Sequence, residues 1–170
     1  RDAYERLRMT HLIATFFYIG HLRPAPGTWG SLAAIPAAWA LHVLGGPVVL
    51  ALGVVLAFTS GWWATALETK GKTDHDPSEI VIDEVAGQWL AFLPVSIGAA
   101  HAGVALTALW PGWITALIAF RLFDIWKPGP IGWADRRDDA LGVMLDDILA
   151  GVAAALCVML GAWLAHGAFA

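Results

Sequence analysis

Two short segments of the sequence place a pair of adjacent carboxylates at the start of an apolar run. These pairs are Asp83-Glu84 and Asp146-Asp147, and each is preceded by three apolar residues and followed by small and apolar residues that include a glycine. A fifth acid, Asp124, ends another apolar run. Carboxylate oxygens are the ligands that Mg²⁺ takes in proteins, together with water and substrate phosphate. The pattern predicts a Mg²⁺ site formed by Asp83, Glu84, Asp124, Asp146 and Asp147.

These acids need a compensating positive charge if they lie near hydrocarbon. A charged side chain at the centre of a bilayer costs about 2.5–3.5 kcal/mol, and neighbouring carboxylates also repel one another. Arg121 and Lys127 each lie three residues from Asp124, on its side of a helix, but neither acid pair has a cation nearby in the sequence. The alternative is that the acids are solvated loop residues, or charges that interact favourably with helix N-termini.

A second segment that could bind phosphate is Pro24–Ser31. Its glycines permit a tight turn, its hydroxyls can donate hydrogen bonds, and an apolar run follows it directly. Backbone N–H groups at the start of a helix favour phosphate. A plain turn with Ser31 as the helix N-cap explains the same residues equally well. The candidate phosphate ligands in this segment are Thr28, Gly30 and Ser31.

His75 is the only histidine in the polar segment that leads into Asp83-Glu84. Its ordinary pKa is close to neutrality, so it could act as a general acid or base. A lone histidine in a solvated loop is also often a bystander, and the sequence leaves both readings open.

The elements that position these residues follow from the distribution of charge. Only 14% of the 170 residues are charged and 58% are hydrophobic, whereas soluble domains have about 25% charged residues. All Asp, Glu, Lys and Arg residues fall within 1–23, 68–84 and 121–147. The uncharged stretches between and after them are long enough for membrane spans, which need about 20 residues. The net charge of −4 gives no basic face for nucleic acid.

These stretches predict an all-α, polytopic helical membrane protein that forms a single membrane-embedded domain over 1–170. About five helices are embedded, and an N-terminal segment, 1–23, is interfacial, although 9–20 could also be inserted. The turn signal Gly45-Gly46-Pro47 divides 24–67 into a hairpin. The remaining elements are a polar loop at 68–84, a second hairpin at 85–120, a polar loop at 121–147 and a final span at 148–170.

Two hairpins return the chain to the side from which it started, so all three charged blocks should lie on one membrane face. Basic residues favour the cytoplasmic side, which places that face inside the cell. The two acid pairs then enter the membrane from the same face. The predicted metal site is therefore cytoplasmic.

The sequence resembles the phosphatidylglycerophosphatase A family. The resemblance rests on four motifs in order, which are Pro26–Leu32, His75-Asp76 with Ile82–Gly87, Phe120–Ile131, and Asp146-Asp147 with Gly151. It implies Mg²⁺-dependent hydrolysis of the phospholipid phosphatidylglycerophosphate to phosphatidylglycerol and phosphate, at the cytoplasmic face of a bacterial inner membrane. Membrane lipids are then the implied partners.

With this resemblance, the candidate residues take roles. The metal would lower the pKa of a bound water and neutralise phosphate charge. The nucleophile is either that water or an aspartate, and one or two ions are compatible with the acids. The expected catalytic residues are Asp83, Glu84, Asp146, Asp147 and His75. The expected substrate-binding residues are Thr28, Gly30, Ser31, Arg121 and Lys127.

Two other membrane functions use similar residues. A small cation-coupled transporter could use the same carboxylates as an ion site. The clustering of the acids at one face and the lack of a strong inverted repeat weigh against it. A transferase of the CDP-alcohol type would need a longer spaced aspartate motif that this sequence lacks.

Overall fold

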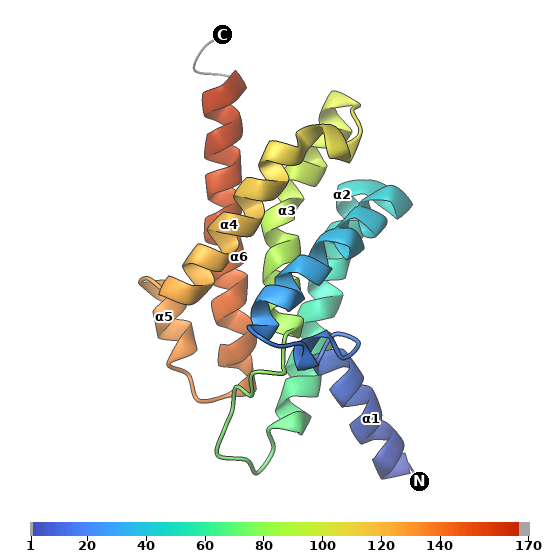
Figure 1. Ribbon diagram of the computed structural model, residues 1–170, viewed down its shortest axis with the longest axis vertical. Coiled ribbons are helices and arrows are strands. Elements are labelled where there is room, and N and C mark those ends of the chain that lie inside the picture. The colour runs from blue at the N-terminus through green and yellow to red at the C-terminus, as the bar shows by residue number, and fades with distance from the viewer. Residues whose placement is uncertain (1, 167–170) are drawn as a thin grey trace.

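The computed structural model describes residues 2–166, and these residues form helices and connecting loops without a strand. The path of the chain is shown in Figure 1. Its elements are α1 (Asp2–Ala14), η1 (Ile19–His21), α2 (Pro26–Glu68), α3 (Ile82–Ala102), η2 (Leu106–Leu109), α4 (Trp110–Trp126), α5 (Pro130–Asp135) and α6 (Ala140–His166). The all-α prediction is confirmed for this part of the chain.

Helix α2 reverses direction halfway along, and its second arm returns toward the end of the molecule from which the first arm started (Figure 1). Helical backbone angles break at Gly45 and Gly46, where the sequence predicts a turn. Gly46 has φ 66° and ψ −154°, a conformation that is open essentially only to glycine. The predicted hairpin at 24–67 therefore corresponds to α2.

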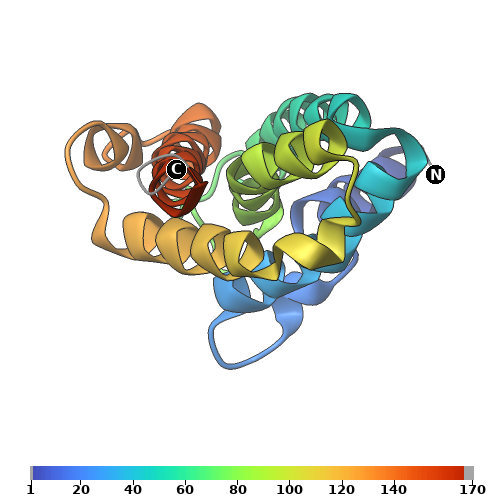
Figure 2. The ribbon, with the colours of Figure 1, turned by 90° about the horizontal axis from the view of Figure 1, so that it is seen from above.

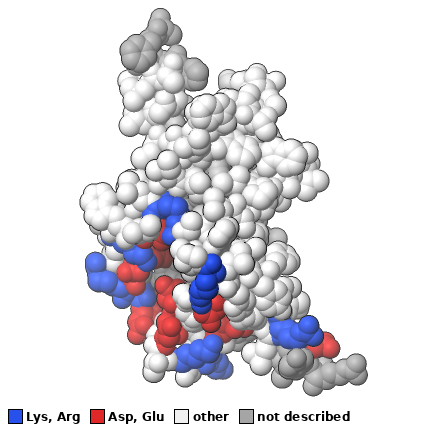
Figure 3. All heavy atoms as spheres, in the orientation of Figure 1, with Lys and Arg blue, Asp and Glu red and all other residues white. Residues whose placement is uncertain are grey.

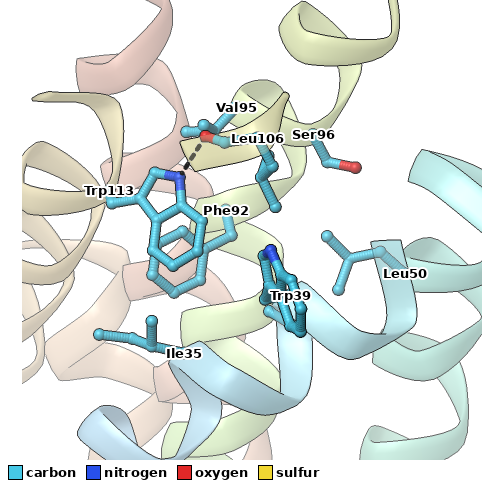
Figure 4. Close-up of a pocket in the computed structure, with 9 residues that line it drawn as sticks. Ile35, Trp39, Leu50, Phe92, Val95, Ser96, Leu106 and Trp113 are labelled. Carbon is cyan, nitrogen blue, oxygen red and sulfur yellow. Dashed lines mark hydrogen bonds between the residues drawn. The ribbon is translucent and has the colours of Figure 1, made fainter. Parts of the chain in front are cut away.

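The predicted hairpin at 85–120 corresponds to α3, η2 and α4. Gly103 ends α3 in the left-handed region, with φ 65°, and the chain turns back through η2. Seen from above, α4 lies along one side of α3 and α6 (Figure 2). The rings of Phe92, near the middle of α3, and Trp113, in the first turn of α4, meet edge to face at 5.8 Å, beside Ile35 of α2 (Figure 4).

Three helical segments are long and apolar enough to cross a membrane, namely Pro26–Glu68, Leu106–Trp126 and Ala140–Ala165. Large apolar side chains lie exposed along them, as expected for a surface that faces lipid. The last of these segments corresponds to the predicted final span at 148–170, of which 167–170 lie outside the described residues. Arg1 of the predicted interfacial segment also lies outside the described residues.

Charged residues gather at one end of the molecule (Figure 3). This end carries the loop between α2 and α3, the segment from α4 to α6, and α1 (Figure 1). Helix α1 is attached there to the end of α2, because Thr10 Oγ1 donates a hydrogen bond to Glu68 Oε1 at 2.6 Å. The three charged blocks of the sequence thus meet in space.

Candidate active site

Three buried carboxylates converge at the charged end. Asp83 and Glu84 lie in the first turn of α3, Asp147 lies near the start of α6, and one oxygen from each lies within 4.8 Å of the others. Asp83 is 6% exposed and Asp147 is 2% exposed. Asp83 Oδ1, Glu84 Oε2 and Asp147 Oδ1 are buried and have no hydrogen-bond partner among the described residues. The three carboxylates could hold a metal ion, and their all-oxygen donor set fits a hard divalent cation.

A close crossing of α3 and α6 brings these carboxylates together. Gly87 and Gly151 lie one turn beyond Asp83 and Asp147, in the same relative position. A β-carbon placed on Gly151 would lie 3.1 Å from the Cα of Gly87, so the two backbones touch at this point. Glycines let helix backbones approach closely in membranes. The repeated pattern of an aspartate and a glycine four residues later therefore sets the separation of the two aspartates.

Asp146 points to a different partner from its neighbour Asp147. Its Oδ2 accepts a hydrogen bond from Lys127 Nζ at 2.7 Å, and the same ammonium group contacts Asp135. Burial disfavours the charged lysine, but hydrogen bonds to Asp135 and Asp146 outweigh it and raise the pKa of Lys127 above its ordinary value. Lys127 therefore stays protonated at the edge of the carboxylate cluster.

Arg121 provides the positive charge nearest to the three carboxylates. Its Nη1 is paired with Asp124, as the spacing predicts, and lies 3.9 Å from Glu84 Oε1. Its Nε is buried without a partner in the described part of the chain. Asp124 in turn lies next to Asp147. The guanidinium is thus partly engaged and has donors left for an anion.

The start of α2 reaches the cluster through Gly27. A β-carbon on this residue would lie 3.1 Å from Glu84 Cδ and 3.3 Å from Arg121 Nη1. Of the three predicted ligands in this segment, Thr28 is exposed and Gly30 is packed against the side chain of Val81. Ser31 is fully buried, and its Oγ has no partner within residues 2–166.

His75 lies at the outer edge of the site. Its Nε2 is 3.6 Å from Oδ1 of Asp138, a residue whose side chain is 86% exposed. The following residue, Asp76, lies close enough to Asp83 and Asp146 for their charges to interact. The Asp76 side chain remains in contact with solvent, but partial burial of its carboxylate raises its pKa. The positive charge of Lys127 lowers this pKa, and the negative charge of Asp135 raises it.

Three residues of the site were not among the sequence-predicted ligands and bases, namely Gly27, Asp76 and Asp135. Gly27 and Asp76 belong to segments that the sequence singles out, but the spacing does not show which residue of each segment faces the carboxylates. Asp135 lies in α5, a short helix that begins at Pro130, and its contact with Lys127 depends on the loop between α4 and α5. The tertiary structure, and not a local sequence pattern, therefore places these three residues at the site.

The fold and the site define a class, which is that of helical membrane proteins with a buried carboxylate cluster at one end of the bundle. Among solved structures, none matches the chain. A family profile described as Phosphatidylglycerophosphatase A matches residues 12–162, and the chain belongs to this family.

Two relatives carry the same description. The Phosphatidylglycerophosphatase A of Escherichia coli (strain K12) is 37% identical over 158 residues, which cover 90% of this chain and 85% of that protein. The Phosphatidylglycerophosphatase A of Haemophilus influenzae is 35% identical over 154 residues, which cover 89% of this chain and 88% of that protein. The predicted family is therefore confirmed.

Proposed function

We propose that this protein is a Mg²⁺-dependent lipid phosphatase that hydrolyses phosphatidylglycerophosphate to phosphatidylglycerol and phosphate. The observation that carries the proposal is the cluster of Asp83, Glu84 and Asp147, whose buried oxygens lack partners beside Arg121. Family membership supports a phosphate monoester as the substrate. The apolar helices support a lipid that stays in the membrane during the reaction.

Asp83, Glu84 and Asp147 would hold the metal. Asp124 and Asp146 lie beside them and would add negative charge around the ion. When bound, Mg²⁺ neutralises phosphate charge and makes water more acidic. Arg121 has unsatisfied donors and would orient the phosphate and stabilise the negative charge that develops on it. Backbone N–H groups at the start of α2, next to Gly27, favour an anion in the same place.

Lys127 and His75 take supporting roles in this proposal. Lys127 is held in place by Asp135 and Asp146 and adds a permanent positive charge at the entrance. His75 would move a proton between the site and solvent, since it lies at the outer edge of the site and an imidazole can both take up and release a proton. A carboxylate such as Asp76 could take the same role.

We further propose that the charged end faces the cytoplasm of a bacterial inner membrane and that five helical passes are embedded. The two arms of α2, helix α3, helix α4 and helix α6 would be these passes. Basic residues at the charged end, including Lys70, Lys72 and Arg136, support the cytoplasmic orientation. The N-terminal segment would lie at the interface.

The test is phosphate release from the lipid in detergent micelles, with wild type, Asp83→Asn and Asp147→Asn. Both variants should lose activity by at least about 100-fold, since each removes a charged ligand at the reacting centre. Glu5→Gln, a change of the same kind at an exposed position, should keep wild-type activity. Near-full activity of either cluster variant in a folded protein would contradict the proposal.

The same assay separates a phosphatase from the transporter alternative. A phosphatase needs no sealed compartment and works in micelles, whereas transport requires two separated volumes. The family match does not favour transport. Alternating access also needs a gate on each side of the membrane, whereas the charged residues gather at one end of the molecule (Figure 3).

A further inference from the structure

A cavity of about 240 Å³ lies between the N-terminal segment, both arms of α2 and helix α3. The described residues that line it include none of the candidate active site. Ile82 and Trp89 form its α3 wall, and they point in nearly the same direction because they lie seven residues apart. Asp83 leaves the helix about 100° away from Ile82. The cavity and the carboxylate cluster therefore lie on different sides of α3.

One wall of the cavity is a single face of the second arm of α2, formed by Gly53, Leu56, Ala57 and Ser60. Their spacing is that of residues which share one side of a helix. Ser60 lies at the level of Ile82, because a β-carbon placed on its neighbour Gly61 would lie 3.0 Å from Ile82 Cγ2. This wall and the α3 wall thus begin together, at the charged end of the molecule.

The far end of the cavity is closed where both arms of α2 meet α3. A β-carbon on Gly53 would lie 2.8 Å from Leu41 Cδ1 and 3.4 Å from Trp89 Cζ3, which leaves no room between these residues. Seven residues separate the two ends of the cavity on each wall, a length of about 10 Å. The cavity is therefore an elongated space that begins at the charged end and stops at Trp89.

The rim of the cavity is apolar and strained. Phe17 and Leu56 are 69% and 67% exposed, so the cavity opens on the surface that faces lipid. Phe16, Phe17 and Tyr18 have φ of 45°, 56° and 67°, in the left-handed region that bulky residues rarely adopt. Phe16 packs edge to face on Trp89, with 6.2 Å between the ring centroids. Strained backbone of this kind is frequent where a ligand is held.

The lining determines the chemistry of the occupant. Its polar side-chain atoms already have partners, since Ser60 Oγ donates to the carbonyl oxygen of Leu56 at 2.6 Å and Trp89 Nε1 donates to that of Ala34 at 2.9 Å. Apolar cavities do not hold water and take up apolar molecules instead. An extended hydrocarbon chain of about eight methylene groups is about 10 Å long, given a C–C bond of about 1.5 Å. A hydrocarbon chain therefore fits both the lining and the length.

We infer that this cavity binds one acyl chain of a phospholipid of the adjacent leaflet, at a site separate from the candidate active site. The lipid head group lies at the charged end, and the chain runs from Ile82 toward Trp89, the direction that acyl chains of that leaflet take. The bound chain also covers the exposed ring of Phe17. Because the cavity and the cluster lie on different sides of α3, the occupant is a resident lipid and not the substrate. The inference does not depend on the proposed function.

The probe is a phosphatidylcholine that carries a diazirine in the middle of one acyl chain, as a trace component of dioleoylphosphatidylcholine vesicles that contain the intact protein. Irradiation attaches the acyl chain to neighbouring residues, and mass spectrometry of the peptides locates the label. Phe16, Leu56 and Trp89 should receive about tenfold more label per residue than Leu156 and Met159. These two residues of α6 are exposed and lie outside the cavity, so they report contact with lipid in general.

Ser60→Phe should fill the cavity and reduce the label on its walls about tenfold. Thr59→Phe is the matched control, because Thr59 is exposed outside the cavity and its hydroxyl likewise donates to a carbonyl oxygen of its own helix, that of Val55 at 2.9 Å. This control should be labelled like wild type. Ser60→Leu adds a smaller side chain and should reduce the label in part, which keeps the test available if phenylalanine prevents folding as judged by circular dichroism.

Three results would overturn the inference. Equal label per residue on the cavity walls and on α6 is the first, and it needs no variant. Unchanged label in a folded Ser60→Phe protein is the second. The third is a selective loss of label from the cavity when part of the vesicle lipid is replaced by phosphatidylglycerophosphate, which would assign the cavity to the substrate. The proposed function is tested separately, since the probe carries no phosphate monoester.

Discussion

The close crossing of α3 and α6 makes Gly87→Ala a sensitive test of how the carboxylates are positioned. A β-carbon at this residue would lie 2.5 Å from Phe120 Cε2 and 3.0 Å from the carbonyl carbon of Asp147, whereas ordinary contact begins at 3.4 Å. The helices must therefore separate by about 1 Å, because a tightly packed interior cannot absorb the added atom locally. Asp147 belongs to the contacted backbone, so its carboxylate moves with it.

We expect the loss of activity to occur in a protein that remains folded. Displacing a reacting group by about 1 Å can cost about 100-fold in rate. Overpacking by one methyl group costs about 1–3 kcal/mol of stability. We therefore expect phosphate release to fall about 100-fold in a variant that still folds, as judged from circular dichroism and Tm.

The matched control is Gly161→Ala, the same substitution in α6 at a position with no atom within 4 Å of the added carbon. It should keep wild-type activity and gain helix stability of about 0.5–1 kcal/mol. If Gly87→Ala also kept full activity while folded, the crossing would not set the separation of Asp83 and Asp147.

The carboxylate cluster and its lysine neighbour allow three further measurements. Mg²⁺ should raise the Tm of wild type, corresponding to about 2.7 kcal/mol at 100 times Kd; a shift that persists in Asp147→Asn would argue against the site. A chelator should stop phosphate release and Mg²⁺ should restore it, so activity that survives chelation would exclude the metal. Lys127→Met should cost on the order of 3 kcal/mol, because Asp146 loses its buried partner. The pKa of Lys127 lies above its ordinary value of 10.5 in the folded protein, so its contribution is complete below that value and lost only as the pH rises through the folded-state pKa. The Tm difference should thus be equal at about pH 8 and about pH 9.5, and a difference that shrinks at the higher pH would contradict the raised pKa.

Much of the fold follows from where charge is absent. The turn at Gly45 and Gly46 was predictable because two glycines and a proline interrupt an apolar stretch that is too long for one pass. The gathering of the charged blocks at one end follows from the number of passes between them. Helix α5 was not predictable, since a segment of six residues that begins with a proline is too short to show a periodic pattern.

The sequence located the acid pairs but could not show which member of each pair faces the cluster. Consecutive helical residues point about 100° apart, so Asp146 and Asp147 take different partners. In α3 both acids belong to the cluster, because the longer side chain of Glu84 reaches it despite the different direction in which it leaves the helix.

The gathering of charge at one end has a consequence for lipid traffic. Under the proposed function, carboxylates and cations at a single end mean that the protein acts on lipids whose head groups lie in the adjacent leaflet. Phosphate leaves directly into the water on that side, and the dephosphorylated lipid stays in the leaflet where it was made. Supply of the product to the opposite leaflet therefore requires a separate lipid-flipping step, and the two leaflets differ in composition until that step occurs.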